Sequence, residues 1–362
     1  MNNYIFFIGT LLEGGAERVI SILTKELADE KDTKVSIVLW YDKDTFYQIS
    51  PKVNLIKIPQ MSGNNNFFQN LLWFRKFLKK EKGVLISFLA SFNMLAIVAH
   101  LFVKTPIIVA DRSDPSRVPT NYFIRKIRDI LYIFADGVVL QTKQNSRYFS
   151  HITSSKKTVI YNPILLGDRN GIALSTNKKK KIVSVGRLIP LKNHELLINA
   201  FSLIIKKYPD YELWIYGEGM LRAHLEEIIK RLDLSKRIYL PGNSKKVYEE
   251  ICDAEIFVLS SNYEGMPNAL LEAMCLGLPV ISTKVSGASD IIKDGENGYL
   301  VEPNDINGMV NAIDKLVSDE KKREAFAKEA SKLSKITDSH IISLQWKKYI
   351  DGVRAKREDG NE

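Results

Sequence analysis

Short apolar runs alternate with longer amphipathic stretches along the first half of the chain. Apolar runs predict strands, and stretches whose apolar residues recur every three or four positions predict helices. The predicted strands cover residues 4–8, 35–40, 54–58, 84–89, 107–110, 137–140 and 158–160, and the predicted helices cover 16–28, 69–80, 93–103 and 124–134. Strands that alternate with helices in this way indicate a parallel, doubly wound sheet.

A second series of the same kind begins near residue 182. Its predicted strands cover residues 182–185, 212–216, 238–240, 256–259 and 279–282, and its predicted helices cover 193–207, 221–232, 246–252 and 268–276. Polar and charged residues at 168–181 predict a linker between the two series.

These two series predict an α/β protein with two Rossmann-like domains, residues 1–167 and 182–336. In such sheets ligands bind at the carboxyl ends of the strands, so a cleft between the domains is expected. Residues 337–362 are predicted to form a C-terminal helix that crosses back to the first domain.

Residues 84–103 require a separate test, because they contain no Asp, Glu, Lys or Arg and are long enough to span a bilayer. Ser87, Asn93 and His100 interrupt the run, which divides into a strand, a turn and a helix. Buried parallel strands and the helices that cover them are apolar on all sides. We therefore predict a core segment at these positions.

The N-terminus has neither the basic region nor the long apolar run of a signal peptide. The two cysteines, Cys252 and Cys275, exclude a disulfide framework. We therefore expect buried free thiols in a reducing compartment, which indicates a cytoplasmic protein.

The net charge of +10 is concentrated in the first half of the chain. Residues 1–170 contain 23 Lys and Arg against 14 Asp and Glu, whereas residues 171–362 contain 29 against 28. A basic first half beside a balanced second half indicates that the first half alone meets an anionic surface or substrate.

The most informative motif runs from Glu264 to Glu272, with seven residues between the two glutamates. It follows a predicted strand, and Pro267 predicts the first turn of a helix. First-turn amides are expected to face outward and bind an anion, and here they belong to Asn268, Ala269 and Leu270. Two carboxylates around such amides suit a nucleotide sugar, and the alternative is a plain loop with two solvated acids.

Two cations, Arg187 and Lys192, lie five residues apart directly after the first strand of the second domain. A guanidinium and an ammonium suit a diphosphate, and they would stabilise its growing charge if it is a leaving group. The alternative is a pair of ordinary surface cations. Two glycine turns that follow later strands, at residues 217–219 and 241–243, either close around a base or only turn the chain.

Gly14 and Gly15 follow the first strand and precede a helix, so a phosphate could approach the backbone there. Their spacing differs from the dinucleotide fingerprint, which disfavours a nicotinamide enzyme. Asp42 and Asp44 form a D-x-D pair of the kind that holds a metal, although a solvated loop is the favoured reading. None of the five histidines has metal-ligand spacing, and no metal is expected.

Two predicted helices combine basic with aromatic and aliphatic side chains. The cations are Arg75, Lys76, Lys79 and Lys80 in residues 69–80, and Arg125, Lys126 and Arg128 in residues 122–134. The apolar residues of both helices are expected to pack on the sheet. The excess of cations on the first helix is expected to meet an anionic lipid or a lipid phosphate.

Together these motifs resemble those of the family 4 glycosyltransferases, which have the two-domain GT-B fold. The resemblance covers nearly the whole chain. It is densest at residues 186–192, 217–219, 264–272, 277–280 and 295–300, with weaker matches at 14–17 and 86–93. The closest subgroup resembles bacterial enzymes that extend glycans on polyprenyl diphosphate, for capsule, O-antigen or glycoprotein oligosaccharides.

The resemblance implies a nucleotide-sugar donor, retention of anomeric configuration and no metal or other cofactor. It implies that Glu264 and the amides after it contact the donor sugar, that Glu272 holds the ribose, and that Arg187 and Lys192 bind the diphosphate. The rest of the predicted donor site consists of Gly15, Gly217, Glu218, Gly242, Gly265, Met266, Asn268, Ala269 and Leu270. The predicted acceptor site consists of Gly14, Arg75, Lys76, Lys79, Asn93 and Arg112.

One position departs from the family pattern. Many members have a histidine just after the strand that here ends at Ala110, whereas this chain continues with Asp111 and Arg112. Arg112 is a candidate for the role of that histidine.

We therefore predict a peripheral glycosyltransferase on the inner face of the plasma membrane, with Glu264, Arg187 and Lys192 as catalytic residues. It would move a hexose or N-acetylhexosamine from a UDP-sugar to a polyprenyl-diphosphate-linked saccharide. A nucleotide-sugar epimerase of similar architecture is the alternative enzyme, and it would need no acceptor. A basic nucleic-acid-binding protein is the alternative outside enzymes, and the balanced second half disfavours it.

Overall fold

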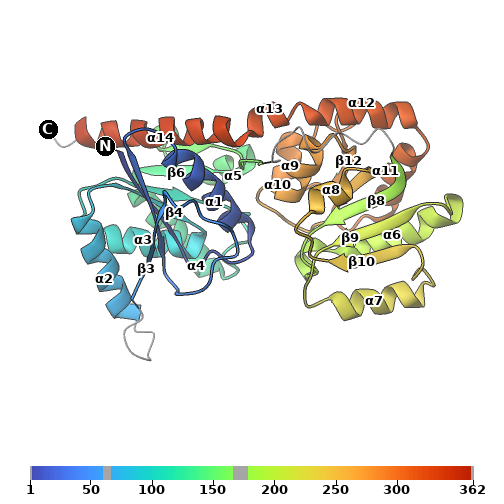
Figure 1. Ribbon diagram of the computed structural model, residues 1–362, viewed down its shortest axis with the longest axis horizontal. Helices are drawn as coiled ribbons and strands as arrows, with labels where there is room; N and C mark the ends of the chain where they lie inside the picture. The colour runs from blue at the N-terminus through green and yellow to red at the C-terminus, as the bar shows by residue number, and fades with distance from the viewer. Residues whose placement is uncertain (1, 60–66, 166–177, 360–362) are drawn as a thin grey trace. The chain divides into compact units, whose positions relative to one another are not determined.

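The computed structural model describes residues 2–59, 67–165 and 178–359. The chain divides into two compact units, unit 1 with Met1–Leu165 and Thr337–Glu362, and unit 2 with Leu166–Ile336. Each unit contains one parallel sheet with helices on its faces (Figure 1). The predicted α/β class with two Rossmann-like sheets is confirmed.

Unit 1 contains a seven-stranded sheet with the strand order β3-β2-β1-β4-β5-β6-β7. Its strands are β1 (Asn2–Ile8), β2 (Thr33–Leu39), β3 (Asn54–Lys57), β4 (Val84–Phe88), β5 (Ile107–Ala110), β6 (Gly137–Leu140) and β7 (Lys157–Val159). All pairs are parallel, and Phe6 of the central strand is in register with Ile37 of β2 and Ile86 of β4. Carboxyl ends of these strands therefore meet at one edge of the sheet.

Helices cover both faces of the unit 1 sheet because alternate residues of its strands point to opposite sides. Phe6 and Ile8 pack in the core beneath α1 (Gly15–Ala28) and α14 (Ser339–Asp359), which lie side by side. Ile5 and Phe7 pack in the core beneath α2 (Phe67–Lys80) and α3 (Ala90–His100). Also in unit 1 are α4 (Tyr122–Leu131), α5 (Lys143–Tyr148), and the short helices η1 (Tyr132–Phe134) and η2 (Ser154–Lys156).

The C-terminal helix α14 is part of unit 1. Trp346 is fully buried beneath it and stacks on Phe88 of β4, with 5.6 Å between the ring centroids. Ile342, Ile350 and Val353 follow at helical spacing in the same core. This burial explains why residues far apart in sequence form one unit.

Unit 2 contains a six-stranded sheet with the strand order β10-β9-β8-β11-β12-β13. Its strands are β8 (Lys179–Val185), β9 (Glu212–Tyr216), β10 (Ile238–Gly242), β11 (Ala254–Leu259), β12 (Val280–Thr283) and β13 (Tyr299–Val301). Its longer helices are α6 (His194–Lys207), α7 (Arg222–Arg231), α8 (Val247–Ile251), α9 (Asn268–Cys275), α10 (Ser286–Ile291), α11 (Ile306–Val317) and α12 (Glu320–Ser331). The short helix η3 (Pro190–Lys192) precedes α6, and α13 (Ser334–Thr337) follows α12.

The predicted C-terminal bound of the linker, residue 181, was wrong. Residues 168–177 lie outside the described residues, and Lys179, Lys180 and Lys181 already belong to β8. Lys181 is buried, its ammonium donates to the carbonyl of Glu250 at 2.6 Å, and it lies 4.7 Å from the ring centroid of Trp214. The lysines can therefore begin a strand, because oxygen atoms of other segments bind their ammonium groups.

The apolar segment 84–103 has the predicted architecture of a strand, a turn and a helix. It forms β4 and α3, with Leu89 between them in a left-handed conformation (φ 73°). Among the described residues, no helix combines the length and the apolar character that crossing a bilayer requires.

Both cysteines are free thiols, as expected. Cys275 is buried as predicted, but Cys252 is only partly buried, because it lies at the end of α8.

Candidate active site

Lys192 and Glu264 meet beyond the carboxyl ends of β8 and β11. Lys192 ends the short helix η3, and Glu264 lies in the loop between β11 and α9. Their side chains form an ion pair, with 15% and 14% of each side chain exposed. The Ser261 hydroxyl donates to the same carboxylate oxygen of Glu264 at 3.0 Å. Ligand sites of parallel sheets occupy this edge, so the pair lies where a substrate is expected.

Backbone and side-chain hydrogen bonds tie the two loops together. The Asn262 amide donates to the carbonyl of Leu191 at 2.8 Å, and the Ser260 hydroxyl donates to the carbonyl of Lys192 at 2.9 Å. The side chain of Asn193, which caps α6, donates to Asn262 at 3.0 Å. The positions of the lysine and the glutamate are therefore fixed by their loops as well as by their own ion pair.

Arg187 lies on the same loop as Lys192 but differs from it in exposure. Its side chain is exposed, and it forms no hydrogen bond or ion pair with any residue that the structure describes. The next residue, Leu188, is fully buried, and its amide donates to the carbonyl of Glu218 at 2.8 Å. A fixed backbone therefore presents a solvated guanidinium, which suits the predicted contact with a diphosphate.

Gly217 is required for the close approach of two loops. It has a φ of 139°, and a Cβ atom there would lie 2.1 Å from the carbonyl oxygen of Gly186. Its amide donates to the carbonyl of Gly242 at 2.9 Å, and Gly242 also has a positive φ, 88°. The glycine turns therefore bring the ends of β8, β9 and β10 together.

Gly217→Ala is expected to lower the free energy of unfolding by about 2–4 kcal/mol, since it adds a backbone clash to an unfavourable φ. Gly295→Ala is the matched control, because Gly295 has a φ of 78° but nothing within 4 Å of the added Cβ. The control should cost only about 1 kcal/mol. Urea denaturation of both variants measures the difference, and equal losses would contradict the role of the close approach.

The side chain of Glu218 is engaged within the protein. Both of its carboxylate oxygens accept from the Arg222 guanidinium, at 2.6 and 2.8 Å. This contact lowers the pKa of Glu218. A Cβ atom at Gly242 would lie 2.7 Å from the Glu218 carboxylate. Glu218 was predicted to contact the nucleotide-sugar donor. In the structure its carboxylate binds Arg222 and orders the glycine turn.

Helix α9 begins at Asn268, as predicted, but Pro267 is its extended N-cap and not a residue of its first turn. The first turn contains Asn268 and Ala269, both half-buried. The prediction of a free amide is wrong for Leu270, whose N–H donates to the carbonyl of Pro267 at 3.1 Å. A tight first turn forms this bond because the extended N-cap proline turns its carbonyl toward the helix.

The remaining predicted donor residues of this segment are buried. Glu272 is 5% exposed and Met266 is 6% exposed, and Gly265, directly before Met266, is also buried. Glu272 lies on the second turn of α9, where its neighbours on the helix are also buried. A carboxylate is rarely buried without a specific function or partner. Its predicted contact with a ribose stays a prediction.

Gly287 of α10 is a functional position that sequence reasoning missed. A Cβ atom there would lie 2.4 Å from the carbonyl oxygen of Gly265 and 2.7 Å from Cα of Met266. The hydroxyl of Thr283, at the end of β12, donates to the carbonyl of Ser261 at 2.6 Å. These residues position the loop that carries Glu264. The run of small residues at 286–289, shortly after β12, was the available signal.

His194 is a buried histidine behind the loop of Arg187 and Lys192. It is 3% exposed, its Nε2 lies 3.3 Å from the carbonyl oxygen of Gly186, and its Nδ1 has no recorded partner. Burial, reinforced by the charge of Lys192, lowers the pKa of His194 to about 4. The ring is therefore neutral at physiological pH and donates from Nε2 to the loop.

Unit 2 is expected to lose stability as the pH falls from about 6.5 to about 4, by up to about 3 kcal/mol from His194 alone. The unfolded chain takes up the proton near pH 6.5, whereas the folded chain resists it until about pH 4. Melting temperatures across this range should therefore fall less steeply for His194→Gln than for the parent. His224→Gln, at an exposed histidine of the same unit, is the control for the substitution itself.

Arg112 is the most unusual predicted residue in unit 1. It follows β5, is 9% exposed, and makes one hydrogen bond, from Nη2 to Oδ1 of Asn162 at 2.8 Å. Its Nε and Nη1 atoms are buried and form no hydrogen bond with the residues that the structure describes. Burial lowers the pKa of Arg112 to about 9, although the neighbouring Asp111 carboxylate opposes this shift. A buried guanidinium with unused donors favours an anionic ligand at this place.

Gln141 and Asn162 complete a polar cluster around Arg112, and sequence reasoning missed both. Gln141 follows β6, and its amide donates to the same Asn162 oxygen at 2.7 Å. Gln141 and Asn162 are each 2% exposed. The Arg112 guanidinium also lies 5.1 Å from the ring centroid of Phe88, at the end of β4. For Gln141, its position directly after the buried strand β6 was the available signal, whereas Asn162 lies three residues after β7.

Two predicted acceptor residues make structural contacts instead. Asn93 is fully buried, and its amide donates to the carbonyl of Ala110 at 3.0 Å and to the Tyr132 hydroxyl at 2.8 Å. Arg75 donates to the carbonyls of Ala99 and Leu101, at 2.9 and 2.6 Å, so it caps the C-terminus of α3. Both side chains therefore have a structural role, and their predicted contacts with an acceptor stay predictions. Lys76 and Lys79 are exposed on α2, as predicted.

The glycine turn after β1 has a different arrangement from the prediction. Helix α1 begins at Gly15, with Gly14 as its extended N-cap. A Cβ atom at Gly14 would lie 2.2 Å from the Glu17 carboxylate, so that acid covers the start of its own helix. An acid near a helix N-terminus is stabilising. The place predicted for a phosphate at Gly14 and Gly15 is therefore next to a carboxylate in this structure.

The D-x-D pair makes a local contact. Asp42 forms an ion pair with Lys57 at 2.5 Å. No group of three or more His, Cys, Asp or Glu suited to a metal occurs among residues 2–59, 67–165 and 178–359. That the reaction needs no metal stays a prediction.

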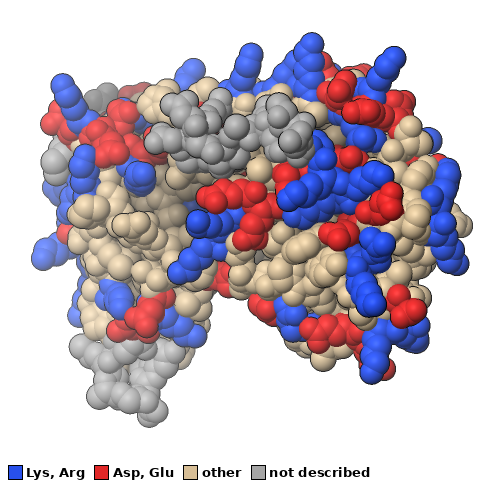
Figure 2. All heavy atoms as spheres, turned by 45° about the vertical axis from the view of Figure 1, so that its right-hand side comes forward, with Lys and Arg blue, Asp and Glu red and all other residues tan. Residues whose placement is uncertain are grey.

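Basic and acidic side chains are interspersed on the surface of unit 2 (Figure 2), as its balanced composition predicts.

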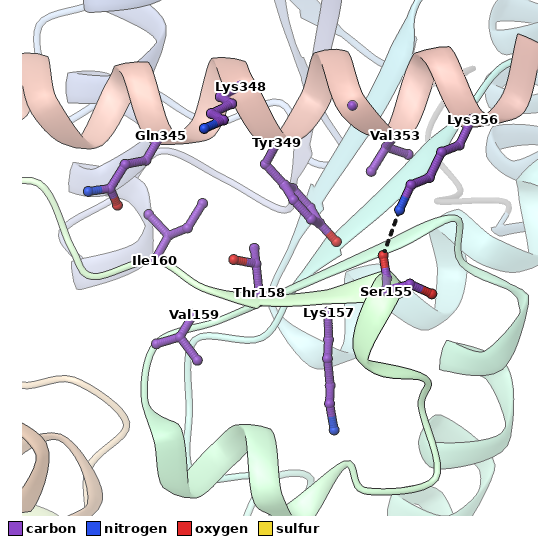
Figure 3. Close-up of a pocket in the computed structure, with 11 residues that line it drawn as sticks. Ser155, Lys157, Thr158, Val159, Ile160, Gln345, Lys348, Tyr349, Val353 and Lys356 are labelled. Atoms are coloured by element: carbon purple, nitrogen blue, oxygen red, sulfur yellow. Dashed lines mark hydrogen bonds between the residues drawn. The ribbon is translucent and has the colours of Figure 1, made fainter.

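In unit 1, a groove of about 480 Å³ lies between β7 and α14 (Figure 3). Tyr349 and Lys356 face it from the helix, and Lys356 donates to the carbonyl of Ser155 at 3.2 Å. None of the predicted site residues lines this groove.

The fold and these loops define a GT-B transferase, and comparison with known proteins places the chain more narrowly. The family model "Glycosyl transferases group 1" matches residues 171–333. An N-acetylgalactosaminyltransferase of Campylobacter jejuni, named for an N-acetylgalactosamine-N,N'-diacetylbacillosaminyl-diphospho-undecaprenol substrate, is 30% identical over 365 residues. That match covers 96% of this chain and 98% of the relative. The chain therefore belongs to the group 1 glycosyltransferases and is a glycosyltransferase.

Other relatives and solved structures agree with this family. A second Campylobacter jejuni α-1,4-N-acetylgalactosaminyltransferase, named for a diacetylbacillosamine-diphosphate-undecaprenol glycan, is 28% identical over 96% of this chain and 98% of its own length. Anabaena HepE in complex with UDP and glucose has a TM-score of 0.80 at 18% identity, covering 96% of this chain and 99% of HepE. TarM has a TM-score of 0.82 at 15% identity, covering 97% and 99%. The predicted GT-B fold is confirmed.

Proposed function

We propose that this glycosyltransferase moves a hexose or N-acetylhexosamine from a UDP-sugar to a saccharide linked to polyprenyl diphosphate. The observation that carries this proposal is the match over nearly the full length to two transferases named for undecaprenyl-diphosphate-linked glycans. UDP as the donor nucleotide is supported by HepE, whose fold this chain shares and which was crystallised with UDP and glucose.

The donor is proposed to bind at the carboxyl edge of the unit 2 sheet. Arg187 is exposed and unpaired among the described residues, and Lys192 lies five residues further along the same loop. Both would bind the diphosphate, while Glu264 and the first turn of α9 would hold the sugar. Glu272 would accept from the ribose hydroxyls. In this arrangement Lys192 exchanges its contact with Glu264 for one with a phosphate oxygen.

The proposed reaction retains the anomeric configuration. The bond between the anomeric carbon and the diphosphate oxygen breaks, and the acceptor hydroxyl attacks from the face that the diphosphate leaves. The proton of that hydroxyl passes to the departing phosphate oxygen, so no protein side chain acts as a covalent nucleophile. Lys192 and Arg187 stabilise the negative charge that develops on the diphosphate. No metal is proposed, because the two cations supply that stabilisation.

The acceptor is proposed to approach unit 1. Lys76 and Lys79 are exposed on α2 and carry charge complementary to a lipid diphosphate. Arg112 has buried donors without a recorded partner at the carboxyl edge of the sheet. An acceptor of this kind is held in a membrane by its lipid, so we also propose that the protein acts at the cytoplasmic membrane surface.

A panel of UDP-sugars tests the proposal. The purified chain is incubated with each donor and with undecaprenyl-diphosphate-linked saccharides in mixed micelles, and released UDP and the extended lipid are measured. We expect one donor to give both products in equal amounts. Incubation with the donor alone is the control for the alternative enzyme, since an epimerised donor without acceptor would contradict transfer. The relatives named above are transferases, which gives an epimerase no support.

A further inference from the structure

Helix α4 of unit 1 carries its apolar residues outward. Phe123, Ile127 and Ile130 follow one another at helical spacing on one side, with 75%, 53% and 60% of each residue exposed. Arg128 is the one buried residue of this helix, all of which the structure describes. The helix is therefore inverted relative to an ordinary surface helix, whose apolar side faces the core.

Hydrogen bonds fix the rotation of α4 about its own axis. Arg128 donates to the carbonyls of Val118 and Pro115, at 2.5 and 2.9 Å, and to the carboxylate of Asp129 at 2.7 Å. Arg125 donates to the carbonyls of residues 119 and 120 at 2.8 and 2.7 Å. Turning the apolar side inward would break these bonds and leave charged groups unpaired. The outward apolar side is thus a consequence of how the helix is anchored.

This finding corrects a sequence expectation. The apolar residues of 122–134 were expected to pack on the sheet, as in an ordinary surface helix. Tyr132 is buried as expected, but the larger set is exposed and consists of Tyr122, Phe123, Ile124, Ile127, Ile130, Ile133 and Phe134. Sequence periodicity gives an apolar stripe but not the direction in which it points.

The helices next to α4 also carry exposed apolar residues. Helix α3 contacts both α2 and α4 (Figure 1). Exposed large apolar residues on these neighbours are Phe67, Phe68 and Leu72 of α2, Val98 of α3, and Leu101 and Phe102 just after α3. Phe102 is 94% exposed and has a positive φ, 61°. So many exposed large apolar residues on one layer of packed helices indicate an interaction site.

The charges of this helix layer identify the kind of partner. Helices α2, α3 and α4 together contain one acidic residue, Asp129, and it is paired with Arg128. Exposed lysines on or beside the three helices are Lys76, Lys79, Lys80, Lys104 and Lys126. Aromatic and aliphatic side chains flanked by cations, with no free acid, complement a membrane surface that contains anionic lipids.

We propose that the exposed side of α4 docks on an anionic bilayer, with Phe123, Ile127 and Ile130 inserted at the boundary between headgroups and acyl chains. The neighbouring lysines contact lipid phosphates. The proposed function supplies the reason for this docking, because an enzyme that acts on a lipid-linked acceptor must reach the membrane. It assigns the anchoring to α4, whereas the basic helix α2 remains the proposed contact of the acceptor diphosphate.

Vesicle sedimentation tests the proposal with the full chain. The parent is expected to bind vesicles that contain phosphatidylglycerol, more weakly in high salt, and to bind pure phosphatidylcholine vesicles less. The triple variant Phe123→Ser, Ile127→Ser, Ile130→Ser should bind at least about tenfold less. The control variant Leu203→Ser, Met220→Ser, Ile306→Ser removes exposed apolar residues of unit 2 and should bind like the parent. All six side chains are exposed, so both variants should fold.

Two results would overturn the docking proposal. Equal vesicle binding by the parent and the α4 variant would show that the helix is not the anchor. A parent that ignores vesicles but forms a dimer, which the α4 variant loses, would assign the surface to a second copy of the chain. Titration with UDP by calorimetry runs in parallel. Absence of UDP binding beside intact vesicle binding would contradict the proposed donor while supporting the docking surface.

Discussion

Lys192→Ala is expected to lower kcat by about 10²- to 10³-fold while donor affinity falls much less. The Lys192 ammonium is paired with Glu264 and is largely buried. The proposed reaction moves this cation onto the departing diphosphate, where its charge is worth most as the bond breaks. Its contribution to the bound donor is smaller, because the exposed Arg187 contacts the same diphosphate in the ground state.

The measurement combines steady-state kinetics with calorimetric titration of UDP. Lys284→Ala is the matched control, because Lys284 of unit 2 also forms an ion pair, with Glu302, but is 47% exposed. The control should retain kcat within about twofold, since a surface ion pair contributes little. Equal losses of kcat and of UDP affinity in Lys192→Ala would make Lys192 only a binding residue. Melting temperatures separate either outcome from unfolding.

Arg112→Met is expected to abolish most of the transfer activity without loss of stability. Transfer should fall at least about 10²-fold, because a charge-assisted contact with an anionic group is removed from a buried site. The free energy of unfolding should stay the same or rise by about 1–3 kcal/mol, since two buried guanidinium nitrogens without partners disappear. A residue that costs stability and is retained for function has this signature.

Arg128→Met is the matched control for stability. Arg128 is also a buried arginine of unit 1, but it donates to two backbone carbonyls, to Asp129 and to the Tyr148 hydroxyl. Its replacement should lower the free energy of unfolding by about 3–5 kcal/mol, because Asp111 and Asp129 lose their cation. Chemical denaturation and transfer assays on both variants give the comparison. A large stability loss in Arg112→Met would identify Arg112 as a structural residue.

The sequence predicted the positions of the charged residues on the unit 2 loops better than the contacts of the residues chosen in unit 1. Lys192, Glu264 and Arg187 are local features of loops that directly follow strands, so their positions follow from the strand pattern alone. Asn93 and Arg75 were predicted from a resemblance and from the amphipathic pattern of a helix. Their contacts with Ala110, Tyr132 and the end of α3 depend on neighbouring elements, which the pattern does not specify.

The sequence by itself determined the two parallel sheets, the family, and the glycine and charged loops at the strand ends. These features depend on apolar periodicity and on short motifs, which are local properties of the chain. Only the tertiary structure decided that Glu264 forms an ion pair with Lys192, that two nitrogens of the buried Arg112 form no hydrogen bond with the described residues, and that α4 turns its apolar side outward. Burial and hydrogen-bond partners come from segments distant in sequence, so the same residue types could have been core, surface or site until packing fixed their neighbours.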